Sequence, residues 1–474
     1  MKTTKIVLSG AVCSVIMLGA AESQAAAAAG GLRAGAAKVE FTPLQSELRT
    51  PTDIIHDPLF ARAIVVQGPD ACAVLVGLDY GGAREPMIAA ALPRVIAASG
   101  CPEQNIVISG THTHSSNTGG LGGAGAPSAE KVANAIVTAV TQAKARLRPA
   151  RIGYGTTKID LNVNRDLYTA TGEWRQQPNP DGPSDDTLAV LEFIGEDYIP
   201  IGVYMNYAMH PVNFYLTGAI SADFPGVASR TIEDDFDEKT VAIFAQGASG
   251  DQNPGLRESA NVTSLRTGQP YATPTIGAPP APRSTSLNPV ADNTAVQDRP
   301  IPPQNLEAYR KQIARTGRAV NAQGTLIALA AMNVMRATKT TGESTIWGGQ
   351  RRFTCPGRER LDAANPAREN VFPGYRDGPD VNLKVGVIRI GDVNIVSING
   401  EVYSQIAMRL KAASPATQTM VTTLANGAAN SGYIYSNEAY SHLTFQVIGS
   451  RLKPFCAENA IISNALALLN EANP

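Results

Sequence analysis

The sequence ACAVLVGL at residues 71–78 and the sequence IVIS at residues 106–109 are two apolar runs on either side of a helical pattern at residues 84–98. A third apolar run, ARAIVV, precedes them at residues 61–66, and an amphipathic helical pattern follows them at residues 128–147. Apolar runs this short are typical of buried strands, and strands that alternate with helices favour parallel pairing. This part of the chain therefore predicts an α/β fold.

The alternation continues along the chain, so we expect mixed or parallel sheets layered with helices. A segment rich in Pro, Thr, Ser and Ala interrupts it at residues 257–303. This segment is either a mobile lid or an unstructured insertion, and its lack of periodicity favours the insertion. Further strands are predicted at 188–193, 199–207, 241–245, 383–390 and 393–398, and further helices at 226–235, at 305–332, after Gly400 and at 457–470.

Length and charge narrow the class of protein. The chain has 474 residues, of which 43% are hydrophobic, which is enough for a large core in one or more domains. Its 40 basic and 41 acidic residues give a formal charge of −1. A protein that binds nucleic acid electrostatically carries a basic excess or a basic stripe, so we expect no nucleic-acid partner.

The N-terminus has the pattern of a signal peptide. Lys2 and Lys5 precede an apolar run at residues 6–21, and the sequence SQAA at residues 23–26 offers a small-residue cleavage site. An uncleaved anchor helix is the alternative, but the run is short for a bilayer span and no later segment is long and uncharged enough. We therefore expect residues 1–25 to be a signal peptide and the protein to be secreted or periplasmic.

Export changes how the cysteines are interpreted. Four remain after cleavage, and none belongs to a Cys-x-x-Cys pair, so a thiolate zinc site is not expected. An even number in an oxidising compartment allows two disulfides. Cys72 opens one predicted strand and Cys101 precedes the next, which suggests that they pair and leaves Cys355 with Cys456. This pairing is a hypothesis, which free-thiol counting would reject if all four thiols react.

Two of the five histidines follow the strand IVIS directly, in the sequence GTHTHSS at residues 110–116. Residues at the carboxyl end of a buried parallel strand face the crevice where α/β proteins bind ligands. The two-residue period of a strand would direct both imidazoles, His112 and His114, to one side. A His-x-His pair alone is weak evidence for a site, since it also occurs as hydrogen-bonded loop histidines.

Three more segments carry a polar side chain that could belong to a site. His210 follows an apolar strand in the sequence NYAMHP at residues 206–211, and Glu401 ends the sequence INGE at residues 398–401, where a strand turns into a helix. Glu401 is expected at a helix N-terminus, which favours a carboxylate and hence a metal ligand. Tyr433 lies in the sequence SGY at residues 431–433. Taken singly, a satisfied core histidine, an ordinary helix acid and a packed tyrosine are equally good interpretations.

Taken together, these motifs resemble the neutral/alkaline ceramidase family. Three other stretches are similar to that family: HDPLFARA at residues 56–63, ISADFPGVASR at 220–230 and FAQGASGDQNP at 244–254. The resemblance runs from about Leu32 to the end of the chain, apart from the Pro-rich segment. It implies a single large zinc-hydrolase domain at residues 32–474, with the insertion at about 257–303. It also implies four zinc ligands, which match His112, His210, Glu401 and Tyr433.

The implied chemistry is hydrolysis of an amide. Two imidazoles and a carboxylate are a recognised set for catalytic Zn²⁺, which lowers the pKa of a bound water to about 7 and so generates hydroxide. That hydroxide would attack the amide carbonyl, while the zinc, Tyr433 and an arginine stabilise the oxyanion. The substrate-binding arginine of the family matches Arg165, in the sequence NRD at 164–166. His114 is the expected proton donor to the leaving amine.

Four departures from the family pattern bear on the substrate. SSNTGG at residues 115–120 replaces the family's S-G-P-G-G, and Asn399 replaces a proline. Phe445 stands where the family has a tyrosine that lines the site, so a hydroxyl is lost. There is also no room for the C-terminal immunoglobulin-like domain of many ceramidases, so presentation of a membrane substrate is expected to differ.

Three functions follow as hypotheses. The first is an exported zinc amidohydrolase for an N-acyl lipid such as ceramide, a role in sphingolipid metabolism, with transient contact with a membrane surface. The second is a zinc hydrolase for other amides or esters, in line with Phe445. The third is a non-catalytic exported binding protein in which the metal is structural.

Overall fold

The computed structural model describes residues 31–118, 125–256, 262, 264–267, 296–363 and 367–474. The signal peptide expected at 1–25 and most of the Pro-rich segment at 257–303 lie outside these residues. Among the described residues, no helix combines the length and the apolar character needed to cross a membrane.

Eight strands form a mixed sheet whose halves join through two residue pairs between β1 and β6. The pairs β4–β5 and β10–β12 are parallel, and the other neighbours are antiparallel. Strand β12 at one end of the sheet contacts β3, β4 and β5 at the other end. The two halves of the sheet therefore pack against each other. In sheet order the strands are β12 (Val241–Gln246), β10 (Pro200–Tyr207), β9 (Thr187–Gly195), β6 (Arg148–Lys158), β1 (Arg33–Glu40), β3 (Phe60–Gln67), β4 (Cys72–Leu78) and β5 (Ile106–Gly110).

Helices cover the outer face of each half. Helices α1 (Glu85–Ser99) and α2 (Ala129–Ala145) enclose one apolar core against β1, β3, β4 and β5. Helices α3 (Asp223–Asp235) and α5 (Leu306–Ala337) enclose a second core against β9, β10 and β12. Side chains of both halves and of a second sheet share a further core between them. Burial on both faces explains why these strands are nearly continuous apolar runs.

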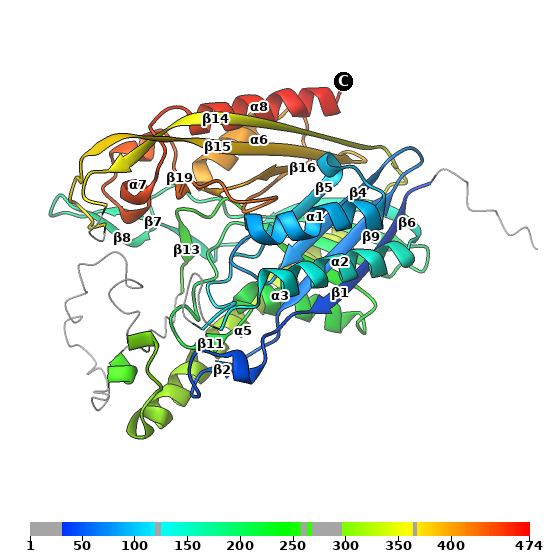
Figure 1. Ribbon diagram of the computed structural model, residues 1–474. Coiled ribbons are helices and arrows are strands. Elements are labelled where there is room, and N and C mark those ends of the chain that lie inside the picture. The colour runs from blue at the N-terminus through cyan, green and yellow to red at the C-terminus, as the bar shows by residue number, and fades with distance from the viewer. Residues whose placement is uncertain (1–30, 119–124, 257–261, 263, 268–295, 364–366) are drawn as a thin grey trace, which may run out of the picture.

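The second sheet has four strands and lies above the first in Figure 1, with α8 along its outer side. Helices α6 (Ser404–Ala413) and α8 (Ala457–Ala472) pack on it around an apolar core. Its order is β14 (Ile346–Arg360), β15 (Tyr375–Ile390), β16 (Val393–Ile398) and β18 (Thr419–Thr422), and only β16–β18 is parallel.

Short strands complete the fold near the ends of the long ones. A three-stranded sheet has the order β13 (Gln252–Pro254), β7 (Asn162–Tyr168) and β8 (Trp174–Asn179). Two parallel pairs join β2 (Ile54–Ile55) to β11 (Ala219–Ile220) and β17 (Glu401–Val402) to β19 (Tyr433–Ile434). A five-residue helix, α7 (Phe445–Gly449), follows β19.

The predicted α/β class is confirmed, and each predicted strand and helix has a counterpart. The expected parallel pairing holds only in part, because β1, β6 and β9 run antiparallel to their neighbours in the large sheet. The hypothesis of two disulfides is confirmed as well, since Cys72 is bonded to Cys101 and Cys355 to Cys456.

Candidate metal centre

The site lies where three parallel pairs of strands end. His112 follows β5, His210 follows β10, and Glu401 follows β16, and each of these strands has a parallel neighbour. The carboxyl ends of the strands thus bring together side chains that are up to 289 residues apart in sequence. This is the position predicted for the histidines from the strand pattern.

Three ligand atoms converge there. The Nε2 atom of His112 lies 3.1 Å from Nε2 of His210 and 3.1 Å from Oε1 of Glu401. The same carboxylate oxygen lies 2.9 Å from Nε2 of His210. The two imidazoles are buried, with His210 fully enclosed.

Each imidazole has its other nitrogen fixed by a backbone carbonyl. Nδ1 of His112 lies 2.8 Å from the oxygen of Gly81, and Nδ1 of His210 lies 2.7 Å from the oxygen of Ser249. A carbonyl only accepts hydrogen bonds, so each Nδ1 carries the hydrogen and each Nε2 presents a lone pair. Two lone pairs and a carboxylate then face one another in a buried space, and a shared cation satisfies all three.

The charge states also suit a metal. Burial, reinforced by the nearby Arg165, lowers the pKa of His210 to about 3, so this imidazole is neutral at working pH. Burial opposes ionisation of Glu401, but His112 and His210 outweigh it and hold the pKa of that carboxyl well below its usual range. Neutral imidazoles and an ionised carboxylate are the forms that coordinate Zn²⁺.

The predicted position of Glu401 at a helix N-terminus is wrong. Glu401 opens the short strand β17, and helix α6 begins only at Ser404. In β17 it pairs directly with Tyr433 of β19 in parallel register. This strand pair, and not a helix N-terminus, positions the carboxylate and places Tyr433 beside it.

Tyr433 and Arg165 form the side of the centre next to Glu401. Nη2 of Arg165 donates to the Tyr433 hydroxyl at 3.2 Å and to the carbonyl of Gly250 at 2.6 Å. Burial and the charge of Glu401 raise the pKa of Tyr433, so its phenol stays protonated in the absence of a metal. Phe445 packs edge-on against the Tyr433 ring, with centroids 5.5 Å apart.

His114 lies beside the ligand atoms, but not through the predicted strand period. Strand β5 ends at Gly110, and His112 has a φ of 69°, so the chain turns between the strand and His114. A left-handed φ is uncommon for a residue with a side chain and often marks a functional site. Nε2 of His114 lies 3.4 Å from Nε2 of His112, and its Nδ1 has no hydrogen-bond partner within the described structure.

Two overlapping sets of donors are thus available to a metal. One nitrogen of each of His112, His114 and His210 lies within 4.8 Å of the others. The set of His112, His210 and Glu401 is tighter, with separations of 2.9–3.1 Å, and it contains the anionic group that offsets a divalent charge. His114 is therefore placed next to the tighter set rather than in it.

Sequence reasoning missed the groups that orient the ligands. The carbonyls of Gly81 and Ser249 fix the imidazoles, and the carbonyl of Asp251 accepts a bond of 2.9 Å from the backbone of Arg165. Backbone carbonyls leave no signal in a sequence, although Ser249 and Asp251 lie in the stretch FAQGASGDQNP, which was singled out without a role. The other two histidines lie elsewhere: His56 pairs with Asp57 and His442 with Asp166.

Comparison with known proteins shows what the chain is similar to. Residues 46–356 match the model of the N-terminal part of the neutral/alkaline non-lysosomal ceramidases. Over 236 residues the chain is 29% identical to the neutral ceramidase of Pseudomonas aeruginosa, covering 44% of this chain and 34% of that protein. Over 206 residues it is 28% identical to neutral ceramidase 1 of Arabidopsis thaliana, covering 40% of this chain and 26% of that protein. The matched regions thus span about a third and about a quarter of these two relatives.

The fold is similar over a longer range. The crystal structure of the neutral ceramidase from Pseudomonas aeruginosa superposes with a TM-score of 0.65 and 17% identity, covering 93% of this chain and 75% of that one. A structure described as ceramidase complexed with C2 gives the same TM-score at 18% identity and covers 76% of that chain. Glu401 and Tyr433 lie beyond the residues that the family model matches.

Proposed function

The chain belongs to the neutral/alkaline non-lysosomal ceramidase family, and on that basis we propose that it is a zinc-dependent amide hydrolase for an N-acyl lipid such as ceramide. The observation that carries the proposal is the convergence of two imidazole lone pairs and one carboxylate oxygen within 3.1 Å. His112, His210 and Glu401 would hold the ion, with Tyr433 as the fourth ligand. Zn²⁺ would supply a water of pKa about 7 and polarise the scissile carbonyl.

The protein's own groups fit the remaining steps. The Tyr433 hydroxyl and the Arg165 guanidinium, 3.2 Å apart, would donate to the carbonyl oxygen as it gains negative charge. Neutral His114 would accept the proton of the attacking water and return it to the amide nitrogen as the carbon–nitrogen bond breaks. Burial keeps bulk water away from these groups and strengthens each interaction.

We propose that the protein is exported, with residues 1–25 as its signal peptide and residues 32–474 as the catalytic domain. The two disulfides support this proposal, because such bonds persist in secreted or periplasmic proteins and are rare in the cytosol.

Metal analysis joined to an activity assay tests the zinc proposal. We expect about one zinc per purified chain, loss of hydrolysis of a fluorogenic ceramide after chelation, and recovery when Zn²⁺ is returned. His112→Ala should lose both the metal and the activity. Full activity in a preparation shown to be free of metal would refute the proposal.

A second candidate substrate class is favoured by one contact. Phe445 packs edge-on against Tyr433 with ring centroids 5.5 Å apart, at the position where the family pattern has a tyrosine. A site that lacks this hydroxyl suits a less polar amide or an ester. Comparing a fluorogenic ceramide with short acyl amides and esters separates the two classes. A zinc-loaded chain that cleaves none of them would be a binding protein instead.

A further inference from the structure

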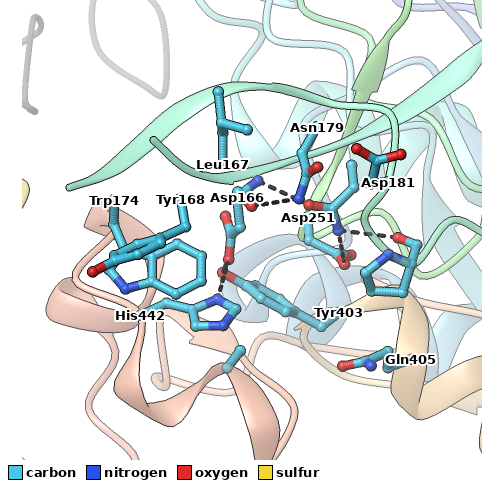
Figure 2. Close-up of a pocket in the computed structure, with 13 residues that line it drawn as sticks. Asp166, Leu167, Tyr168, Trp174, Asn179, Asp181, Asp251, Tyr403, Gln405 and His442 are labelled. Atoms are coloured by element: carbon cyan, nitrogen blue, oxygen red, sulfur yellow. Dashed lines mark hydrogen bonds and ion pairs between the residues drawn. The ribbon is translucent and has the colours of Figure 1, made fainter. Parts of the chain in front are cut away.

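A second polar pocket of about 250 Å³ lies beside the β7–β8 hairpin, separate from the three metal-binding side chains. Figure 2 shows the Asp166 carboxylate between the rings of Trp174 and Tyr168 on one side and the ring of Tyr403 on the other. Asp181 and Asp251 line the same pocket.

Asp166 has an acceptor that nothing in the protein uses. Its side chain is 3% exposed, and its Oδ2 accepts from the Tyr403 hydroxyl at 3.0 Å and lies 3.1 Å from Nδ1 of His442. Its Oδ1 is buried and has no hydrogen-bond partner among the described residues. A buried carboxylate oxygen without a donor is costly, which points to a ligand that supplies one.

Asp251 lines the same pocket, but both of its carboxylate oxygens accept hydrogen bonds from the protein. Its Oδ1 accepts from the backbone of Ser404 at 2.7 Å. Its Oδ2 accepts from the Ser404 hydroxyl at 2.9 Å and from the amide of Asn164 at 3.0 Å. Asp251 is therefore structural, and the open acceptor of this wall belongs to Asp166.

The charge of the lining favours a cation. Three aspartates face the pocket, and no lysine or arginine is among its lining residues. Arg165 is adjacent to Asp166 in β7, but successive side chains of a strand point to opposite faces, and Arg165 bonds to Tyr433 on the other side. The Arg165 side chain therefore lies on the side of the metal centre, and the Asp166 side chain lies on the side of the pocket.

The cation is organic rather than a metal ion. A hard divalent cation needs several oxygens at about 2.0–2.6 Å around one point. Within the part of the chain that the structure describes, the groups of histidine, cysteine, aspartate and glutamate side chains close enough to hold a metal lie at the metal centre and not in this pocket. The pocket instead has an aromatic wall, in which the Trp174 ring is stacked on His442 with centroids 3.7 Å apart and tilted against Tyr168 with centroids 5.0 Å apart. Carboxylates beside aromatic faces suit an alkylammonium group.

We propose that this pocket binds a small organic amine in its ammonium form, with the Asp166 carboxylate as the principal acceptor. Trp174 and Tyr168 contact the carbon part of the ligand, and the exposed Asp181 adds attraction at the mouth. The proposal stands independently of the reaction at the metal centre, because it is tested by binding alone.

Titration of the full, unlabelled chain with ethanolamine, against its neutral analogue ethylene glycol, tests the site. Calorimetry measures affinity, and the fluorescence of Trp174, one of only two tryptophans, reports contact with the pocket. We expect saturable binding of ethanolamine and none of ethylene glycol. Asp166→Asn should lower the affinity about tenfold or more, because a charged acceptor is lost. Glu173→Gln, which removes a carboxylate of the same hairpin that does not line the pocket, should leave the affinity unchanged.

Four results would overturn the proposal: equal binding of both probes, no binding of either, binding of Ca²⁺ in place of the amine, or amine binding that persists in Asp166→Asn. The last would place the amine elsewhere, for instance at the metal centre. If Asp166→Asn does not fold, Asp181→Asn decides, with a severalfold loss of affinity expected and an unchanged affinity contradicting the site.

Discussion

Two buried polar clusters, at the metal centre and at Arg62, show opposite arrangements of charge. In the cluster around Arg62, the guanidinium donates to Asp79 at 2.8 Å and to Glu233 at 2.8 Å, and Lys38 also donates to Glu233 at 2.8 Å. Every strong acceptor there faces a donor. At the metal centre, by contrast, the lone pairs of His112 and His210 and the carboxylate of Glu401 all face one another.

This difference in charge arrangement distinguishes a cluster that stabilises the fold from one that binds a ligand. Burial alone would raise the pKa of Glu233, but the charge of Arg62 outweighs it and lowers that pKa, so the ion pairs neutralise each other within the protein. The metal centre has no such internal partner for its acceptors, since their Nδ1 hydrogens are directed away to carbonyls. A self-contained cluster stabilises the fold, whereas an incomplete one requires something from outside.

The largest effect on activity should come from removing the charge of Glu401 at the metal centre. Glu401→Gln is expected to lower the hydrolysis rate roughly 10³-fold or more and to reduce the zinc content. Its free energy of unfolding in chelator should change by about 1 kcal/mol or less, because the carboxylate serves the ion rather than the fold. Rate measurements, metal analysis and denaturant titration test this, with Glu196→Gln on an exposed turn as the control. Unchanged zinc content and rate would contradict the assignment.

Breaking the cluster around Arg62 should lower the stability of the protein and leave its metal binding unchanged. Arg62→Met leaves the buried Asp79 without its ion-pair partner and Glu233 with Lys38 alone, and is expected to cost about 3–5 kcal/mol in the free energy of unfolding. The zinc content of the chain that remains folded should not change. Arg94→Met, which removes an exposed ion pair with Glu130, should cost less than about 1 kcal/mol. Equal losses for the two variants, measured by denaturant unfolding, would show that the Arg62 cluster adds no more than a surface pair.

The smallest effect concerns a buried carboxyl that has neither a counter-ion nor a metal. Glu192 in β9 is 3% exposed, and burial raises its pKa to about 7. The folded chain then holds a proton that the unfolded chain releases, so stability falls as pH rises from about 4.5 to 7. Glu192→Gln should therefore add roughly 3 kcal/mol at pH 8 and nothing at pH 4. Thermal unfolding at both pH values tests this, and an equal gain at each would mean that packing, not ionisation, is responsible.

Strands with a long apolar run were predictable, whereas short strands and strands rich in polar residues were not. The strands β3, β4, β5 and β10 contain long runs of apolar residues, so they stand out in the sequence. Strands β6 and β14 contain many polar residues because much of their surface is exposed, and they were missed. Helix α3 begins at Asp223, three residues before its predicted start at Gly226.

The sequence by itself determined the alternation of apolar strands and helices, the four cysteines and the family motifs, because periodicity and motifs are local properties of the chain. Only the tertiary structure decided that His112, His210 and Glu401 meet at one point, that β17 pairs Glu401 with Tyr433, and that Asp166 faces away from Arg165 into a second pocket. Those facts depend on which strand ends lie side by side. That choice is made by the burial of whole sheets and helices, and no short stretch of sequence contains it.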